Sequence, residues 1–171
     1  YAALQDALED NAGVTFSKKR IKCGWGEWSL CQATLHAIEA AAEAFPKATH
    51  FYMLSGDCAA VKSAAYAHKF LDDRDVDYVE SFDFFNSDWI KTGFKGERLF
   101  YRHIFNERKY KRLFYAAYHV QRKLRLERKI PDDIQVMIGS QWWCLRRSTI
   151  DAILQFCRDR PDVLRFFRTT W

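Results

Sequence analysis

The chain has 171 residues, of which 49% are hydrophobic and 16% aromatic, and it carries a net charge of +5 with a pI near 9.0. This composition excludes an intrinsically disordered chain and is sufficient for one domain with its own core. No apolar run approaches the roughly 20 residues that a membrane-spanning helix needs, and the first residues lack the pattern of a signal peptide. The chain starts without Met and ends without a stop signal, so we expect a single partial domain, residues 1–171, truncated at both ends.

The first half of the chain alternates between stretches with helix and strand periods. It predicts a polar helical start, short strand or edge segments at 14–16 and 18–23, a helix from Ser29 to just before Pro46, a buried strand at 50–54, a helix from Ser63 to Leu71 and a strand at 78–82. Ser29 is followed three residues later by Gln32, which is a capping-box pattern, and Ser63 is a second expected N-cap.

The second half begins with an irregular aromatic segment at 83–102. It continues with a basic helix at 105–128, strands at 134–138 and 142–145, a helix from Ser148 to Cys157 and a short helix starting at Pro161. Strands separated by helices predict an α/β domain with a mostly parallel sheet flanked by helices. In such sheets ligands gather at the carboxyl ends of strands, which points to Trp25-Gly26, Ser55-Gly56-Asp57, the loop after Phe82 and Gly139-Ser140.

Two short motifs combine glycine, tryptophan and small polar residues beside an apolar run. They are Trp25-Gly26-Glu27-Trp28-Ser29-Leu30-Cys31-Gln32-Ala33 and Gly139-Ser140-Gln141-Trp142-Trp143-Cys144-Leu145. This mixture suits a site that stacks flat rings and hydrogen-bonds hydroxyl groups, as sugar and nucleotide sites do. We expect Trp28 and Trp143 to lie in the core. Trp25 and Trp142 border glycine and polar positions, which favours ligand contact.

The acidic residues leave two interpretations open. Asp57 follows a buried strand and a glycine, where nucleotide-sugar enzymes often place an Asp-x-Asp motif that holds a divalent ion on the diphosphate. The second Asp is missing, so Asp57 is either a ligand residue or a turn residue. The acidic run 73–77 precedes a strand and lacks the glycine and terminal Glu of an EF-hand, so we expect a solvated turn. The run Glu97–His103 is either an acceptor-binding wall or the start of a charged helix.

The five cysteines and five histidines show no spacing typical of a metal site. No Cys-x-x-Cys pair and no Cys/His zinc pattern occurs, so we expect no structural metal and mostly buried free thiols. Positive charge is concentrated at the basic helix: residues 107–129 contain nine basic residues and two acidic ones, Glu107 and Glu127. The plain interpretation is a solvated helix face, and the alternatives are a surface for anionic lipid or for a phosphate-bearing ligand.

Four segments, taken in chain order, resemble those of the core-2/I-branching β-1,6-N-acetylglucosaminyltransferases and the related peptide O-xylosyltransferases, glycosyltransferase family 14. Residues 28–33 look like the family's Trp-Ser-x-x-Gln-Ala, residues 54–63 like its Leu-Ser/Cys-Gly-x-Asp-x-Pro-Ile-Lys, residues 95–98 like its Lys-x-Glu-Arg and residues 139–143 like its Gly-Ser-x-Trp/Tyr-Phe. Asp57 stands one place early, Ala60 replaces the usual Pro, and the basic segment at about 105–129 has no counterpart and resembles an insertion.

The resemblance implies a GT-A-like nucleotide-diphospho-sugar transferase fold and inverting transfer of GlcNAc or xylose from a UDP-sugar to an acceptor hydroxyl. In core-2 members this transfer runs without a divalent metal and without another cofactor. The resemblance implies nucleotide-sugar contacts for Trp25 and Asp57. It implies acceptor contacts for Lys95, Arg98, Ser140, Gln141 and Trp142.

The family's general base is a Glu shortly after an aromatic that aligns with Trp171, so we expect the catalytic residue downstream of this chain and the chain alone to be inactive. The partners implied are a UDP-sugar and a glycan or glycoconjugate acceptor, without nucleic acid, and we add a membrane-surface contact through Arg108–Lys129. The alternative function is a basic module that binds a membrane surface or nucleic acid without catalysis.

Overall fold

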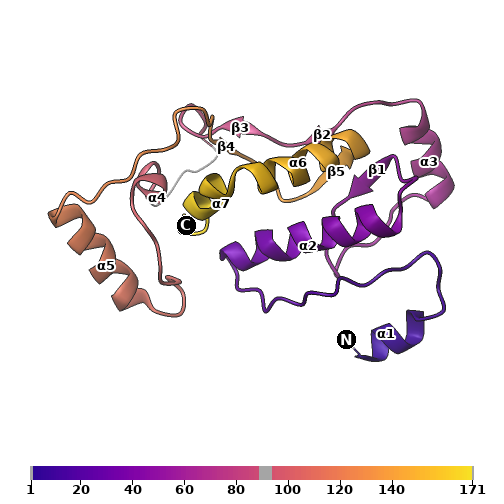
Figure 1. The fold of residues 1–171 in the computed structure, drawn as a ribbon, viewed down its shortest axis with the longest axis horizontal. Coiled ribbons are helices and arrows are strands. Elements are labelled where there is room, and N and C mark those ends of the chain that lie inside the picture. Colours follow the sequence, from indigo (N-terminus) through magenta and orange to yellow (C-terminus); the bar gives the residue numbers. More distant parts are fainter. Residues whose placement is uncertain (1, 89–93, 171) are drawn as a thin grey trace.

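The computed structural model describes residues 2–88 and 94–170, and helices and short strands alternate along them (Figure 1). In chain order the elements are α1 (Ala2–Leu8), α2 (Trp28–Ala44), β1 (His50–Tyr52), α3 (Ala64–Asp72), β2 (Tyr78–Val79), β3 (Phe82–Asp83), α4 (Glu97–Phe100), α5 (Lys111–Lys123), β4 (Met137–Ile138), β5 (Trp143–Arg146), α6 (Arg147–Asp159) and α7 (Pro161–Phe167). The predicted mixed α/β class is confirmed.

The larger sheet has three strands, with β5 between β1 and β2. β5 is antiparallel to both neighbours, so that Leu145 lies opposite Phe51 and Cys144 lies opposite Tyr78. β1 and β2 therefore run in the same direction and are connected through α3, as the strand–helix–strand pattern predicts.

The parallel pairing expected from that pattern is not what the described strands form. Each of their pairs is antiparallel, including the small sheet of β3 and β4. The reason is that β5, which comes about 65 residues after β2 in the chain, is inserted between the two strands of like direction. Alternation of strands and helices indicates which segments extend, but it does not indicate which strand lies beside which.

The core lies between β5 and the two helices α2 and α6, which lie side by side (Figure 1). Ile38 and Ala42 from α2 meet Leu145 from β5 and Ile150 and Leu154 from α6. On each helix the two residues are four apart, which places them on one face. Trp143 packs against this core, as predicted.

A second packed unit, which we call the aromatic unit, contains α4 and α5 and lies at one end of the molecule (Figure 1). The ring of Phe94 lies 4.6 Å from that of Tyr118 and 5.6 Å from that of Phe114, measured between centroids. His103 stacks on Phe114 at 5.1 Å, and Leu99 is 2% exposed. The irregular aromatic segment predicted at 83–102 thus supplies half of this unit, although its residues 89–93 lie outside those described.

Arg128 joins the aromatic unit to α7. Its guanidinium donates hydrogen bonds to the carbonyl of Leu99 at 2.7 Å, to the carbonyl of Phe166 at 2.8 Å and to the hydroxyls of Thr169 and Thr170 at 2.7 and 2.8 Å. A cation at this place also satisfies the carbonyl end of α7. Burial, and secondarily the nearby Arg102, lower the pKa of Arg128 to about 10, so the side chain remains charged at neutral pH.

Several predicted element boundaries are corrected. The segments at 14–16 and 18–23 form no strand. The basic helix is shorter than 105–128, because α5 begins at Lys111 and ends at Lys123. α2 begins at Trp28 with Glu27 as its N-cap, and α6 begins at Arg147, so neither Ser29 nor Ser148 caps a helix.

The expected cap at Ser63 is confirmed, since its hydroxyl accepts from the amide of Tyr66 at 3.2 Å. Pro161 occupies the first turn of α7, also as predicted.

The acidic run 73–77 is not merely a solvated turn. The carboxylate of Asp77 accepts from the backbone N–H of Arg146 at 2.8 Å, from its guanidinium at 3.2 Å and from the hydroxyl of Thr149 at 2.7 Å. It therefore fastens the start of β2 to the junction of β5 and α6.

The cysteines are free, but Cys23, Cys31 and Cys58 are exposed and only Cys144 is buried, which corrects the expectation of mostly buried thiols. None of the helices in the described parts of the chain is long and apolar enough to span a bilayer.

Candidate nucleotide-sugar site at the first tryptophan motif

The loop before α2 is a tight turn that presents Trp25 to solvent. The amide of Glu27 donates to the carbonyl of Gly24 at 3.1 Å, and Gly26 has a φ of 70°. A turn closed by this bond and with a positive φ at its third residue resembles type II, and glycine adopts that φ without strain. Ser29, from the first turn of α2, accepts from the amide of Gly24 at 3.0 Å and so fixes the loop to the helix.

Asn106 connects this loop to the segment that leads into α5. Its side-chain amide donates to the carboxylate of Glu27 at 2.8 Å and to the carbonyl of Trp25 at 3.4 Å. Its side-chain oxygen accepts from the amides of Arg108 and Lys109 at 2.9 and 3.2 Å, which is an Asx turn. One residue thus orders both sides of the contact, across about 80 residues of sequence.

Trp25 is 64% exposed, and the guanidinium carbon of Arg108 lies 3.5 Å from its ring centroid. This is a cation–π contact, in which a planar cation covers one part of the indole. The exposed fraction leaves enough of the indole for a second flat ring. Trp25 is thus accessible to a ligand, and its contact with one stays a prediction; Arg108 adds a positive charge beside it.

Beside this turn is a hollow of about 300 Å³ between the start of α2, the segment 103–106 and the chain after α7. Its polar lining comes from three places in the sequence: Glu27, Ser29, Gln32, His103, Asn106, Arg168 and Thr170. A hollow with carboxylate, amide, hydroxyl, imidazole and guanidinium groups can bind a ligand that has both hydroxyls and negative charge.

The charges at the hollow are tuned by their contacts. The ammonium group of Lys109 lies 2.9 Å from Glu27 and is the main cause that lowers the pKa of this carboxyl, with Asn106 adding to the effect. Burial lowers the pKa of His103, so this imidazole is neutral at pH 7. Its Nε2 lies 3.3 Å from the carbonyl of Glu97, an acceptor only, which implies that Nε2 carries the proton.

The other predicted site residues do not line this hollow. Asp57 is exposed in the loop after β1, where its amide donates to the hydroxyl of Ser55 at 3.3 Å, as in a turn. Ser140 accepts from the amide of Trp142 at 3.1 Å and shapes the connection between β4 and β5, while Trp142 is 40% exposed and Gln141 is exposed.

Lys95 and Arg98 lie in the aromatic unit. Lys95 is exposed and has a φ of 40°, and Arg98 is half-buried, with burial lowering its pKa. Glu97 and His103 belong to the run with two open interpretations: the helical one is confirmed for Glu97–Phe100, and the acceptor-binding wall stays a prediction. Glu97–Phe100 is a helical turn, whereas His103 lines the hollow.

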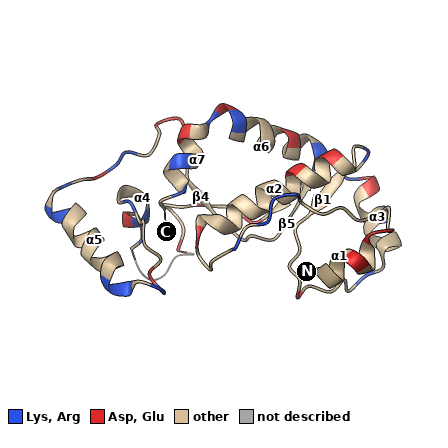
Figure 2. Cartoon of the chain, turned by 60° about the horizontal axis from the view of Figure 1, so that its bottom comes forward, with Lys and Arg blue, Asp and Glu red and all other residues tan. Residues whose placement is uncertain are grey.

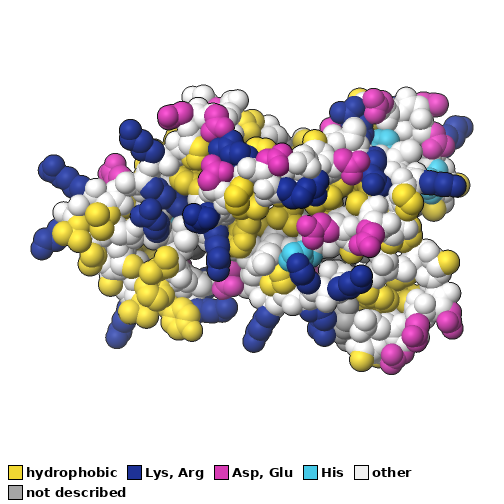
Figure 3. Space-filling view, viewed as in Figure 1, with side chains coloured by type: hydrophobic (Ala, Val, Ile, Leu, Met, Phe, Trp, Pro, Cys, Tyr) yellow, Lys and Arg dark blue, Asp and Glu magenta, His cyan; other side chains and the backbone are white. Residues whose placement is uncertain are grey.

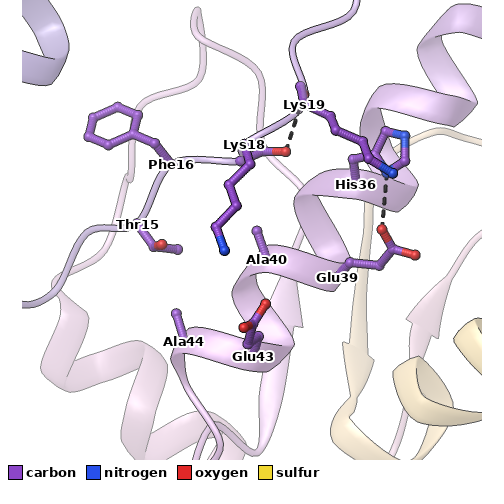
Figure 4. A pocket seen from close by; sticks show the side chains of 10 residues that line it. Thr15, Phe16, Lys18, Lys19, His36, Glu39, Ala40, Glu43 and Ala44 are labelled. Carbon is purple, nitrogen blue, oxygen red and sulfur yellow. Dashed lines mark hydrogen bonds and ion pairs between the residues drawn. The ribbon is translucent and has the colours of Figure 1, made fainter.

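A larger hollow, of about 460 Å³, lies on another face of α2, where the segment 15–19 passes over it (Figure 4). His36 and Glu39 face each other there at 3.0 Å, and Lys18 and Glu43 point into the same space. Neither Trp25 nor Trp142 lines this larger hollow. Its lining pairs Lys18 and Lys19 with Glu39 and Glu43 and has no exposed indole, whereas the hollow beside Trp25 adjoins an indole covered in part by Arg108.

The sequence patterns do not place Asn106, Arg108 or Arg168 at this site, and they predict Arg108 as part of the membrane-surface contact. Asn106 had a detectable signal, since an Asn side chain often accepts from the backbone two residues on in an Asx turn. The pairing of Arg108 with Trp25 had none, because it depends on tertiary contact. Within the described residues no group of three or more His, Cys, Asp and Glu side chains is arranged to hold a metal ion.

Comparison with known proteins places this chain in a family. Searches of the curated proteins and of the solved structures each found no match. A match to a family model covers residues 6–168, which is nearly the whole chain, and the four motifs quoted above occur within it in order. The chain therefore belongs to the Core-2/I-Branching enzyme family, a family of glycosyltransferases.

Proposed function

We propose that this chain is the donor-binding and acceptor-binding part of an inverting glycosyltransferase, which transfers GlcNAc or xylose from a UDP-sugar to the hydroxyl of a glycan or glycoconjugate. The observation that carries the proposal is Trp25, exposed and covered in part by Arg108, on a turn that borders a polar hollow. Membership in the family supports the reaction class.

On the donor side, the flat uracil ring would stack on the exposed indole of Trp25, which gains both apolar contact and a favourable ring geometry. Arg108 and Arg168 would supply positive charge for the diphosphate. Fixed cations can stabilise the negative charge that develops on the leaving UDP, as a metal ion would in other transferases. The proposal therefore needs no divalent ion and no other cofactor.

On the acceptor side, we propose the residues that the family motifs mark: Lys95, Arg98, Ser140, Gln141 and Trp142. The exposed indole of Trp142 can pack on the apolar face of a sugar ring, and the hydroxyl and amide beside it can bind sugar hydroxyls. Asp57 stays a proposed donor-side contact.

The chemistry requires a base that removes the proton from the acceptor hydroxyl as its oxygen attacks the anomeric carbon, while the bond to UDP breaks. The family's base is a Glu, and we propose that it lies outside residues 1–171. His103, although neutral, donates its Nε2 proton to a carbonyl inside the aromatic unit, so we assign it a role in lining the hollow. This chain thus binds the substrates and does not itself move the proton.

Titration calorimetry with UDP, UDP-GlcNAc and UDP-xylose tests the donor half of the proposal. We expect Trp25→Ala to weaken UDP binding about tenfold or more, since base–aromatic stacking contributes about 1–3 kcal/mol. Trp142→Ala is the matched control, because it also removes an exposed indole but belongs to the acceptor side. Equal UDP affinity in Trp25→Ala and the wild type would refute the donor site. Binding that depends strictly on added Mg²⁺ or Mn²⁺ would refute the metal-independent part.

The alternative function, a basic surface-binding module without catalysis, is favoured by one observation. The outward face of α5 carries both basic and apolar side chains that are exposed. Strong binding to vesicles or DNA, with no detectable binding of any UDP-sugar, would favour this alternative.

A further inference from the structure

The outward face of α5 carries a stripe of exposed apolar side chains. Leu113, Val120 and Leu124 are 52%, 55% and 60% exposed. Their spacing of seven and four residues places them on one side of the helix, with Ala116 between them. Tyr110 and Leu126, at the two ends of the helix, are 55% and 50% exposed and extend the same apolar surface.

Basic side chains run along this apolar stripe. Arg112 and Lys123 lie eleven residues apart in the sequence, which is three helical turns, and both are exposed. Arg125 follows at the end of α5, also exposed. Figure 2 shows basic residues at both ends of α5, and Figure 3 shows hydrophobic side chains next to Lys and Arg side chains at that end of the molecule.

No acidic residue lies between Arg108 and Leu126 in the sequence. The two that flank this segment are engaged with tyrosines. Glu107 accepts from the hydroxyl of Tyr115 and Glu127 from that of Tyr101, each at 2.8 Å. These carboxylates keep their negative charge, but they lie outside the segment 108–126, whose charged side chains are all basic.

The opposite face of α5 fixes this orientation. Phe114 and Tyr118 are 2% and 4% exposed and are held in the aromatic unit. The hydroxyl of Tyr118 donates to the carboxylate of Glu97, and Gln121 exchanges hydrogen bonds with the backbone of Arg102 at 2.9 and 3.0 Å. The helix cannot rotate its apolar stripe inward without breaking these contacts.

The C-terminal end of α5 is a well-defined turn. Arg125 has a φ of 53°, its amide donates to the carbonyl of Arg122 at 3.1 Å, and the amide of Leu126 donates to the carbonyl of Gln121 at 3.0 Å. These two bonds form a Schellman motif, which reverses the chain sharply. Leu124 and Leu126 are both exposed at this end of the helix.

We propose that this face of α5 docks on an anionic membrane surface, with Leu113, Val120 and Leu124 entering the boundary between headgroups and acyl chains and Arg112, Lys123 and Arg125 binding lipid phosphates. A helix that lies in the membrane plane needs an apolar stripe bordered by basic residues, and α5 provides both. Nucleic acid is less suitable, because it would leave the apolar stripe in water. A second copy of the chain would bring like charges together.

Flotation with lipid vesicles tests the proposal on the full chain. We expect binding to vesicles of phosphatidylcholine with about a third phosphatidylglycerol, at least tenfold weaker binding to phosphatidylcholine alone, and weakening by salt. The variant Leu113→Ser/Val120→Ser/Leu124→Ser keeps every charge and should bind at least tenfold more weakly. The variant Arg112→Gln/Lys123→Gln/Arg125→Gln should lose the preference for anionic vesicles.

Matched controls use exposed residues elsewhere in the chain. Leu4→Ser/Leu54→Ser/Val61→Ser removes similar apolar area, and Lys22→Gln/Lys47→Gln/Lys69→Gln removes the same charge. Both should bind vesicles like the wild type, and circular dichroism should show all four variants folded. UDP affinity should not change in any of the four variants. A failure of the membrane-docking proposal is therefore distinguishable from a failure of the proposed function.

Three outcomes would overturn the proposal. The first is vesicle binding that is unaffected by the serine variant or equally lost in the controls. The second is binding to DNA that is as tight as binding to anionic vesicles and is unchanged by the serine substitutions. This would assign the face to nucleic acid. The third is a dimer of the wild-type chain in sedimentation velocity that is absent in the serine variant. This would assign the stripe to an interface between copies.

Discussion

The guanidinium carbon of Arg108 lies 3.5 Å from the ring centroid of Trp25, and Asn106 bonds the same loop two residues earlier in the chain. The exposed indole is therefore held from the side by the segment that leads into α5. A ligand ring would meet a preordered surface, which lowers the entropic cost of binding.

Arg108→Ala should weaken UDP binding about two- to fivefold, since an exposed cation–π contact contributes about 0.5–1 kcal/mol. Arg108→Lys should retain part of the affinity because the charge remains but the planar contact is lost. Titration calorimetry measures both. An affinity that rises in Arg108→Ala would mean that Arg108 competes with the ligand for the indole.

Asn106→Ala should destabilise the chain by about 1–3 kcal/mol, because it removes one hydrogen bond to Glu27 and leaves the amides of Arg108 and Lys109 without their partner. Urea unfolding gives the free energy, and hydrogen exchange at the amide of Glu27 reports on the loop. Asn106→Asp is the sharper comparison. It can keep the Asx turn, but it places a carboxylate against Glu27, so its loss of stability should be larger at neutral pH than in acid.

Asp77 should make stability depend on pH at the acidic end. Burial acts to raise its pKa, but the hydrogen bonds from Arg146 and Thr149 outweigh this, so the folded pKa of Asp77 lies below the ordinary value of an aspartate. A group with a depressed folded pKa stabilises fully above its unfolded pKa, and this contribution is lost as pH falls through the folded value. The free energy of unfolding should therefore decrease as the pH is lowered below about 4. Urea titration at a series of pH values measures this decrease.

The slope should be shallower in Asp77→Asn, which cannot titrate, and intermediate in Thr149→Val, which removes one donor to the carboxylate. Identical slopes in all three proteins would show that Asp77 does not contribute to acid sensitivity.

Gly139→Ala should destabilise the chain by about 2 kcal/mol or more, because the new methyl group would lie 1.7 Å from the carbonyl oxygen of Glu80 and the strands β3 and β4 would have to separate. Gly56→Ala is the matched control, since a methyl group there meets nothing within 4 Å. Thermal unfolding of both variants distinguishes them. If the two melt together, the close approach of the second motif to Glu80 is not required for the fold.

Local patterns predicted the existence of most helices and of the longer strands. The apolar spacing of Ile38 and Ala42, the cap at Ser63 and Pro161 at a helix start each reflect short-range physical preferences. The prediction failed where a hydrogen-bond partner differs from the expected one or where an expected pairing strand is missing from the described structure. The hydroxyl of Ser29 bonds the amide of Gly24 and not the helix start, and residues 14–23 have no neighbouring strand in the described structure with which to pair.

The site was predictable only in part. The first motif identified Trp25 from its glycine and its polar neighbours, but the hollow beside it is completed by residues 103–106 and by Arg168, which lie far away in the sequence. The roles of Asp57, Lys95, Arg98, Ser140, Gln141 and Trp142 stay predictions from the family motifs. Their side chains lie on other loops than those that line this hollow.

By itself the sequence determined the family, the mixed α/β class and the indole that faces solvent, because these depend on residue types at short spacings. Only the tertiary structure decided that β5 inserts antiparallel between β1 and β2, that Asn106 ties the Trp25 loop to the start of α5, and which face of α5 points outward. Strand order and contacts across about 80 residues depend on burial and hydrogen bonding over the whole chain. A local sequence pattern cannot predict them.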